Sequence, residues 1–129
     1  MTKAVYTIFF DEKLDLVVME WNDYATSREF REGTELMLDL LIKHNCSRVL
    51  ADIQDMTIIG LEDKIWMEND FLPRAIRQGF KSIAIITPKA YFNKVAVEDI
   101  SYKIDKKKLT LHFFDNLEEG KQWLQTLPK

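Results

Sequence analysis

Acidic and hydroxyl side chains gather at the ends of two apolar runs in the sequence. The stretch RVLADIQDMTIIGLEDKIW (48–66) carries Asp52 and Asp55 where its apolar run ends, and Thr57 comes soon after. Thr87 ends a second run, SIAIIT. In an α/β protein the carboxyl ends of parallel strands are the usual place for a ligand. These four residues are therefore candidates for a phosphorylation, metal or ligand site.

Phosphorylation of Asp52 would require further acids beside it, because such an acceptor shares a magnesium ion with other oxygen ligands. Asp11 and Glu12 follow the first apolar run, but only the residues DEK separate that run from the next one. So short a link predicts a hairpin turn, which places Asp11 at the opposite edge of the sheet from Asp52. We therefore do not expect a phosphoacceptor aspartate.

Other catalytic chemistry also has little support in the sequence. Cys46 lies in a tight turn between a helix and a strand, His44 is two residues away, and there is no nucleophile elbow or Gly-rich phosphate loop. Two histidines and one cysteine give no metal-ligand spacing, so we predict neither a metal ion nor a cofactor. A non-catalytic protein is the favoured interpretation. The alternative is a small-molecule enzyme with an acidic site around Asp52, Asp55 and Thr87 at the carboxyl edge of the sheet.

The strands that must position these residues are read from β-branched and aromatic runs. AVYTIFF (4–10) and LDLVVMEW (14–21) are predicted to form an antiparallel hairpin. RVLADI (48–53) and SIAIIT (82–87) lack polar alternation, which is typical of central strands covered on both faces. LTLHFF (109–114) alternates and is predicted to be an edge strand.

Four helical segments are predicted between and after these strands. The first (26–45) begins with Thr26 and Glu29 at the spacing of a capping box. The second (61–78) should break or kink near Phe71 and Leu72, because Pro73 does not fit comfortably inside a helix. The other two are predicted within 89–104 and 116–127. The order β-β-α-β-α-β-α-β-α indicates an α/β protein with a mostly parallel five-stranded sheet, an antiparallel opening strand and helices packed on it.

Length and composition limit the class of protein further. A chain of 129 residues has the size of a single domain, so we expect residues 1–129 to form one. A net charge of -3 argues against nucleic-acid binding, which needs a basic face. No apolar segment is long enough to span a membrane. The single cysteine, Cys46, fits a reducing compartment, so a cytoplasmic protein is expected.

This order of elements, with VLADIQDMTIIGLED between the central strand and the next helix, resembles the STAS domain over essentially the whole chain. The segments WNDYATSREFREG, LADIQDM and WMENDFLPRAIRQGFKSIAIITP are similar to a branch of small stand-alone bacterial proteins that are SpoIIAA-like. The resemblance implies a non-catalytic binding or regulatory module. Its partner would be another protein or a small apolar ligand.

One feature of the STAS family is missing from the sequence. The resemblance implies a phosphorylatable serine at the start of the helix that follows the central strand. Counted from Asp52, the corresponding positions are Leu61 and Glu62, so the usual acceptor is absent. Thr57 could take this role only from a displaced position. A kinase-regulated switch at this turn is therefore not expected.

Aromatic residues are more numerous than the parallel-strand core requires. Among them, Trp66 and Phe71 are candidates to line an apolar pocket at the carboxyl edge of the sheet, with Asp52, Asp55, Thr57 and Thr87 as its polar rim. The alternative is that most of these aromatics pack between the helices and the sheet.

A second surface for association is predicted on helix 26–44. Leu36, Leu38 and Ile42 lie outside the apolar stripe that should face the sheet. An apolar face left over after core packing usually marks a partner surface, and a symmetric homodimer is the commonest solution. We therefore predict a homodimer with contacts at Leu38 and Ile42.

Overall fold

The computed structural model describes residues 4–128 and begins with the predicted hairpin. Strands β1 (Tyr6–Asp11) and β2 (Leu16–Asp23) pair antiparallel, with Tyr6 opposite Trp21 and Asp11 opposite Leu16. The Asp11 carboxylate accepts hydrogen bonds from the amides of Lys13 and Leu14 at 3.0 and 3.1 Å. This acid therefore stabilises the hairpin turn, at the edge of the sheet where β2 begins.

Three further strands continue the sheet in sequence order. Strands β3 (Arg48–Met56), β4 (Ser82–Ile86) and β5 (Thr110–Phe114) run parallel to β2, and the order is β1-β2-β3-β4-β5. The strands β2 to β5 thus bring their carboxyl ends to one edge. The predicted α/β architecture with an antiparallel opening strand is confirmed.

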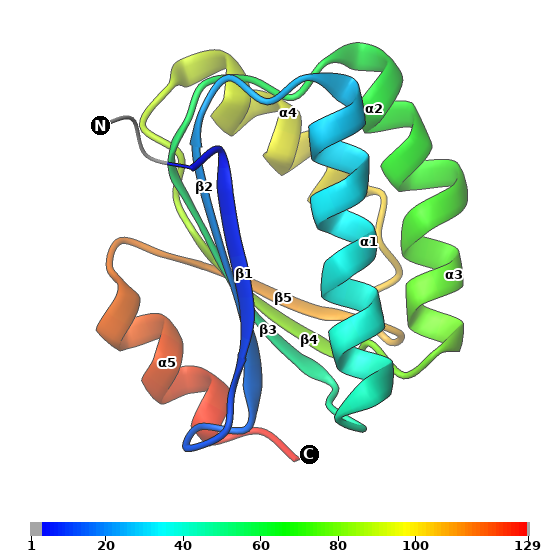
Figure 1. Cartoon of the computed structure of the whole chain (residues 1–129), viewed down its shortest axis with the longest axis vertical. Helices are drawn as coiled ribbons and strands as arrows, with labels where there is room; N and C mark the ends of the chain where they lie inside the picture. The colour runs from blue at the N-terminus through cyan, green and yellow to red at the C-terminus, as the bar shows by residue number, and fades with distance from the viewer. Residues whose placement is uncertain (1–3, 129) are drawn as a thin grey trace.

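The helices cover both faces of the sheet unequally. Figure 1 shows α1 (Ser27–Lys43), α2 (Leu61–Trp66), α3 (Leu72–Arg77) and α4 (Tyr91–Tyr102) on one face, and α5 (Leu117–Gln125) alone on the other. Because strands laid down in one direction with right-handed crossovers place their connections on the same side, the first four helices share a face. Among residues 4–128, none of the helices has the length and apolar character needed to cross a bilayer.

Helix α1 has the ends that its sequence predicts. Thr26 accepts a hydrogen bond from the amide of Glu29 at 3.1 Å, and the Glu29 carboxylate accepts one from the amide of Thr26 at 2.9 Å. At the other end, Asn45 has a φ of 50°, in the left-handed region that asparagine tolerates. These local signals fix the start and the end of the helix.

The helix disturbance predicted near Pro73 takes the form of a wider helical turn. The helix does not break, but a π-helical turn at Met67–Phe71 lies between α2 and α3. The amide of Leu72 donates to the carbonyl of Met67, five residues earlier. Because proline lacks an N–H and its ring crowds the preceding turn, a wider turn accommodates it without ending the helix.

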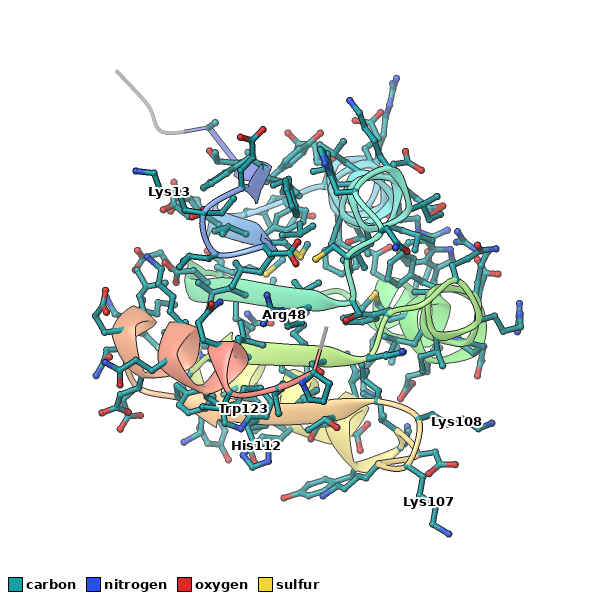
Figure 2. The ribbon with its side chains drawn as sticks, turned by 90° about the horizontal axis from the view of Figure 1, so that it is seen from below. Lys13, Arg48, Lys107, Lys108, His112 and Trp123 are labelled. Carbon is teal, nitrogen blue, oxygen red and sulfur yellow. The ribbon has the colours of Figure 1, made fainter. Side chains whose placement is uncertain are left out.

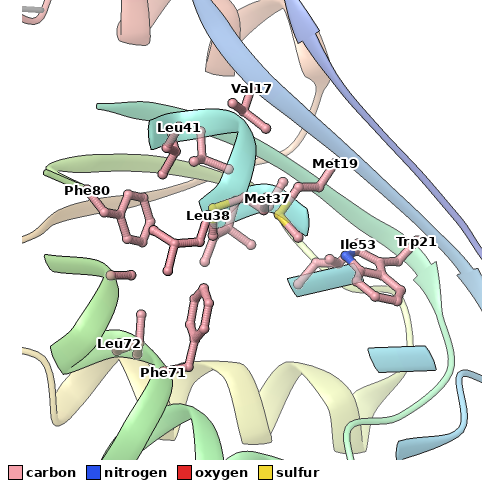
Figure 3. Packing of buried hydrophobic residues seen from close by; sticks show 14 of the residues in the cluster. Val17, Met19, Trp21, Met37, Leu38, Leu41, Ile53, Phe71, Leu72 and Phe80 are labelled. Carbon is pink, nitrogen blue, oxygen red and sulfur yellow. The ribbon is translucent and has the colours of Figure 1, made fainter. Parts of the chain in front are cut away.

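Burial separates the core into two layers. The larger layer lies between the sheet and α1 to α4, and Figure 3 shows part of it. The smaller one lies under α5 and contains Leu50 and Leu124. Arg48, with a relative exposure of 2%, supports this side by donating to the carbonyls of Leu124, Leu14 and Asp15 at 2.8–2.9 Å. Figure 2 shows Arg48 at the sheet beside α5.

The dimer contact predicted at Leu38 is wrong. Leu38 packs in the larger core layer with a relative exposure of 4%, so it has no surface to offer to a second chain. The helix stripe that faces the core is wider than the residues Phe30, Met37 and Leu41 alone would suggest. Ile42, by contrast, is half exposed and stays available for contact.

Candidate functional site

An apolar cavity of about 100 Å³ lies between the sheet and the helix layer. The strands contribute Met19, Ile53 and Ile85 to its lining, and the helical layer contributes Phe71 and Val97. Thr34 carries the one hydroxyl group in the lining, and this group donates to the carbonyl of Phe30 at 2.7 Å. The cavity therefore presents almost no unused hydrogen-bonding group to an occupant.

The π-helical turn forms part of the cavity wall. Met67 and Phe71 line the cavity from this turn, and Leu72 lines it from the start of α3. Phe71 is completely buried, and Figure 3 shows its ring pointing toward Leu38 of α1. A π turn shifts the following side chains around the helix axis relative to a regular α-helix. The turn that accommodates Pro73 thus also sets which apolar groups face the cavity.

Trp66 lies one layer outside Phe71. Its ring centroid is 5.4 Å from that of Phe71 and 6.3 Å from that of Phe30, and the Arg31 guanidinium lies 5.1 Å from the ring centroid. Arg31 also donates to the Asp63 carboxylate at 2.9 Å, which joins α1 to α2. Trp66 is therefore held between two helices, behind the cavity wall.

The predicted acids are placed away from this cavity. Alternation along β3 directs Asp52 to the face that carries α5, since Leu50 packs under that helix. Its carboxylate accepts hydrogen bonds from the Gln54 side chain and amide at 3.0 and 3.3 Å. Asp55 is exposed and forms an ion pair with Lys89 at 3.2 Å. The two carboxylates are thus held by different partners.

The predicted threonines likewise do not join the acids in one site. Thr87 donates through Oγ1 to the carbonyl of Phe114 at 3.1 Å, which ties the end of β4 to β5. Thr57 is exposed, and its amide donates to the carbonyl of Asp23 at 2.9 Å. Neither threonine lines the cavity, and neither do Asp52 and Asp55. The polar rim predicted for the apolar pocket is therefore not part of its lining.

An acidic pair that the sequence analysis missed lies beside β3. Glu20 of β2 is the register partner of Asp52, so the two carboxylates occupy neighbouring strands on the α5 face. The Asn22 side chain donates to Glu20 at 3.2 Å. Because 32 residues separate these acids along the chain, only the register of β2 on β3 could have paired them. This register places two acids side by side on neighbouring strands, as the enzyme alternative would require.

The turn before α2 contains the positions at which the STAS resemblance would place a serine. Gly60 is the N-cap of α2 and gives no side-chain hydrogen bond. Leu61 then begins the helix with a relative exposure of 70%, followed by the exposed Glu62. The exposed position at the helix start is thus occupied by an apolar side chain.

Cysteine and metal chemistry receive no support from the residues described. Burial raises the pKa of the Cys46 thiol, which makes contacts of 3.5 Å with the carbonyls of Asp15 and Arg48. Within residues 4–128, no group of three or more His, Cys, Asp or Glu side chains is placed to hold a metal ion.

The arrangement of strands and helices matches a known fold. A crystal structure of an uncharacterized protein of the DUF3478 family with a SpoIIAA-like fold, from Shewanella loihica PV-4, has a TM-score of 0.61 to this chain. The two chains are 18% identical over 96% of this chain and 98% of the other. Comparisons of the sequence with protein-family models and with curated proteins find no match. The structural similarity confirms the predicted SpoIIAA-like fold.

Proposed function

We propose that this protein is a non-catalytic binding module that takes a small apolar ligand into the cavity between the sheet and the helix layer. The cavity of about 100 Å³ with its apolar lining carries this proposal. A site that offers almost no free hydrogen-bonding group selects for an occupant without polar groups at its buried end. Aliphatic or aromatic hydrocarbon groups are the chemistry that fits.

The volume of the cavity limits the packing free energy that such a ligand can gain. At roughly 24 cal/mol per Å³ of unfilled volume, about 100 Å³ corresponds to about 2 kcal/mol of lost packing. A cavity of roughly 150 Å³ engineered into another protein stays dry and binds benzene or xenon. The comparable volume here would hold one ring or a short alkyl group. A larger ligand would need its remaining part outside the cavity.

A groove between α3 and α4 provides a route for that remaining part. Leu72, Ile100 and Ile104 line both the cavity and this groove, so a single layer of side chains separates the two. Lys103 and Lys108 stand along the outer side of the groove. A ligand with an apolar end in the cavity would therefore leave its other end beside polar and charged groups.

Thermal unfolding with benzene as the probe tests the proposal. Binding to the folded state alone raises the melting temperature as the benzene concentration increases. In an Ala51→Leu variant the new side chain fills part of the cavity, so the shift should be lost. Val95→Leu, on the exposed side of α4, is the matched control and should keep the shift. An equal shift in Ala51→Leu, or none in the native sequence, would contradict binding in the cavity.

Native mass spectrometry of the protein purified gently from its own host addresses the natural ligand. A retained hydrophobic compound that is absent from Ala51→Leu would identify the chemical class of the occupant. A compound retained equally by both proteins would show that it binds elsewhere. If Ala51→Leu does not fold, the smaller change Ala51→Val serves the same comparison.

A protein partner at the carboxyl edge of the sheet is the second candidate function. Leu61 of α2 and Tyr91 and Phe92 of α4 are 70–74% exposed, which is unusual for large apolar side chains. Replacing Phe92 by Ser should abolish the capture of one specific protein from the host, whereas Ile42→Ser should not. Unchanged capture by Phe92→Ser would count against this surface.

A further inference from the structure

Strand β5 leaves one side of its backbone unpaired. In the part of the chain that the structure describes, residues 4–128, it is the last strand in the sheet order and pairs only with β4. The amide of Thr110 donates to the carbonyl of Lys81, and the carbonyl of Phe114 accepts from the amide of Thr87. Because backbone groups alternate between the two sides of a strand, those of Leu111 and Phe113 point away from the sheet. Another extended segment can pair with these outward groups, which otherwise hydrogen-bond to water.

The side chains along this edge do not protect it. Edge strands are commonly blocked by lysine, proline or a bulge, and TLHFF contains none of these within the strand. Phe113 is 36% exposed and Tyr102 of α4 is 75% exposed. Both line a groove of about 250 Å³ between α4 and β5. On the other face, His112 lies against Trp123 with ring centroids 4.7 Å apart (Figure 2).

Opposite charges stand at the two ends of the strand. The residues before β5 include three exposed lysines, and the residues after it include three exposed acids: Lys106, Lys107, Lys108, Asp115, Glu118 and Glu119. Figure 2 shows Lys107 and Lys108 at one end of β5, away from α5. The edge is thus basic at its start and acidic at its end.

We propose that two copies of this chain associate through β5, with the two strands antiparallel. A two-fold axis through His112 places Leu111 of one copy opposite Phe113 of the other, so that all the outward backbone groups of the strand pair. The same rotation brings the basic end of each strand to the acidic end of the other. Two five-stranded sheets then form one continuous sheet.

Charge selects this arrangement over the alternatives. In a parallel pairing the lysines of the two copies would meet each other, as would the acids, which is unfavourable. An unrelated extended peptide would satisfy the backbone groups but would match the two charged ends only by coincidence. A second antiparallel copy matches both ends by symmetry, because each contact in such an interface occurs twice.

The first test removes a single outward N–H. Phe113→Pro keeps the hydrogen bonds to β4, since proline is tolerated where the N–H faces away from the sheet. By symmetry it removes two hydrogen bonds from the dimer, so the dissociation constant from sedimentation equilibrium should rise about ten- to hundredfold. Phe113→Val retains the N–H and should weaken the dimer less. A native protein that stays monomeric up to about 1 mM would overturn the proposal.

The second test exchanges the charges and does not depend on the proline variant. Lys107→Glu with Lys108→Glu should give monomers at low salt, and Glu118→Lys with Glu119→Lys should do the same. Mixing these two variants should restore a dimer, because each acidic end then faces a basic one. Monomers in the mixture would overturn the antiparallel arrangement. A dimer that neither variant weakens would place the interface elsewhere on the molecule.

Discussion

The side chain of Asn93, which is fully buried at the start of α4, is hydrogen-bonded to the segment that follows β3. Its Oδ1 accepts from the amide of Ile59 at 3.1 Å, and its Nδ2 donates to the carbonyl of Met56 at 3.3 Å. One amide group thus satisfies both a donor and an acceptor of the chain between β3 and α2. This contact fixes the segment above the cavity, whose lining includes Met56 and Ile59.

Replacing Asn93 by Ala should destabilise the protein by about 2–4 kcal/mol, because it leaves two backbone groups of a buried region without partners. The free energy of unfolding in urea measures this loss. Asn69→Ala, at an exposed position of the π-helical turn, is the control and should change stability far less. Equal effects of the two substitutions would show that the buried amide has no special importance.

Gly33 of α1 allows the helix to approach the sheet at Trp21. A Cβ atom at this position would lie 2.6 Å from Cη2 and 2.9 Å from Cζ2 of the buried indole ring. Gly33→Ala should therefore cost about 1–2 kcal/mol, since overpacking outweighs the gain of about 1 kcal/mol in helix propensity. Chemical denaturation measures the difference.

Gly60→Ala provides the matched comparison for this substitution. A Cβ at Gly60 would meet nothing closer than Asp63 Oδ2 at 3.8 Å, so this substitution should cause no overpacking and should lose only the preference for glycine over alanine at an N-cap, less than about 1 kcal/mol. An alanine at Gly33 that stabilises the protein would show that Trp21 has room to move. It would also imply that the cavity beside Trp21 can expand.

An ion-pair cluster joins α2, the π-helical turn and α4. Asp99 forms ion pairs with Lys64 and with Lys103 at 3.2 Å, and Lys103 also pairs with Glu68 at 2.9 Å. Hydrogen bonds from Lys64 and Lys103 lower the pKa of Asp99. The ionised form is therefore favoured in the folded protein.

Stability should fall with acid partly through Asp99. Because its pKa is lower in the folded state than in the unfolded state, its contribution is complete above the unfolded pKa of about 3.9. That contribution is lost as the pH falls further, toward the lowered folded pKa. Between about pH 5 and about pH 2, Asp99→Asn should thus lose less stability than the native protein loses over the same pH range. Asp39→Asn, on the exposed face of α1, should retain the native pH dependence; urea titrations across this range decide between them.

Much of the fold could be predicted because its signals are local. The short DEK link required a hairpin, and the capping box at Thr26 and Glu29 located the start of α1. The unbroken apolar runs around Val49 and Ile85 required strands covered on both faces. Pro73 signalled a disturbance in its helix, but whether the helix would break or widen depended on the packing of Phe71.

The candidate site was predicted less well because it depends on strand register and on side-chain direction. Asp52 of β3 and Phe71 of the helical segment that follows lie on opposite faces of the sheet. Leu38 was assigned to the surface because its helix stripe is wider than the simple spacing shows. The pairing of Glu20 with Asp52 required the register of β2 on β3.

The sequence by itself determined the order of the elements, the ends of α1, the antiparallel opening and the absence of a serine at the start of α2. Each of these follows from residue types within a few positions of one another. The tertiary structure alone decided where space remains in the core and which charged residues lie at the two ends of the β5 edge. Both depend on how segments distant in sequence are placed side by side, which no local pattern specifies.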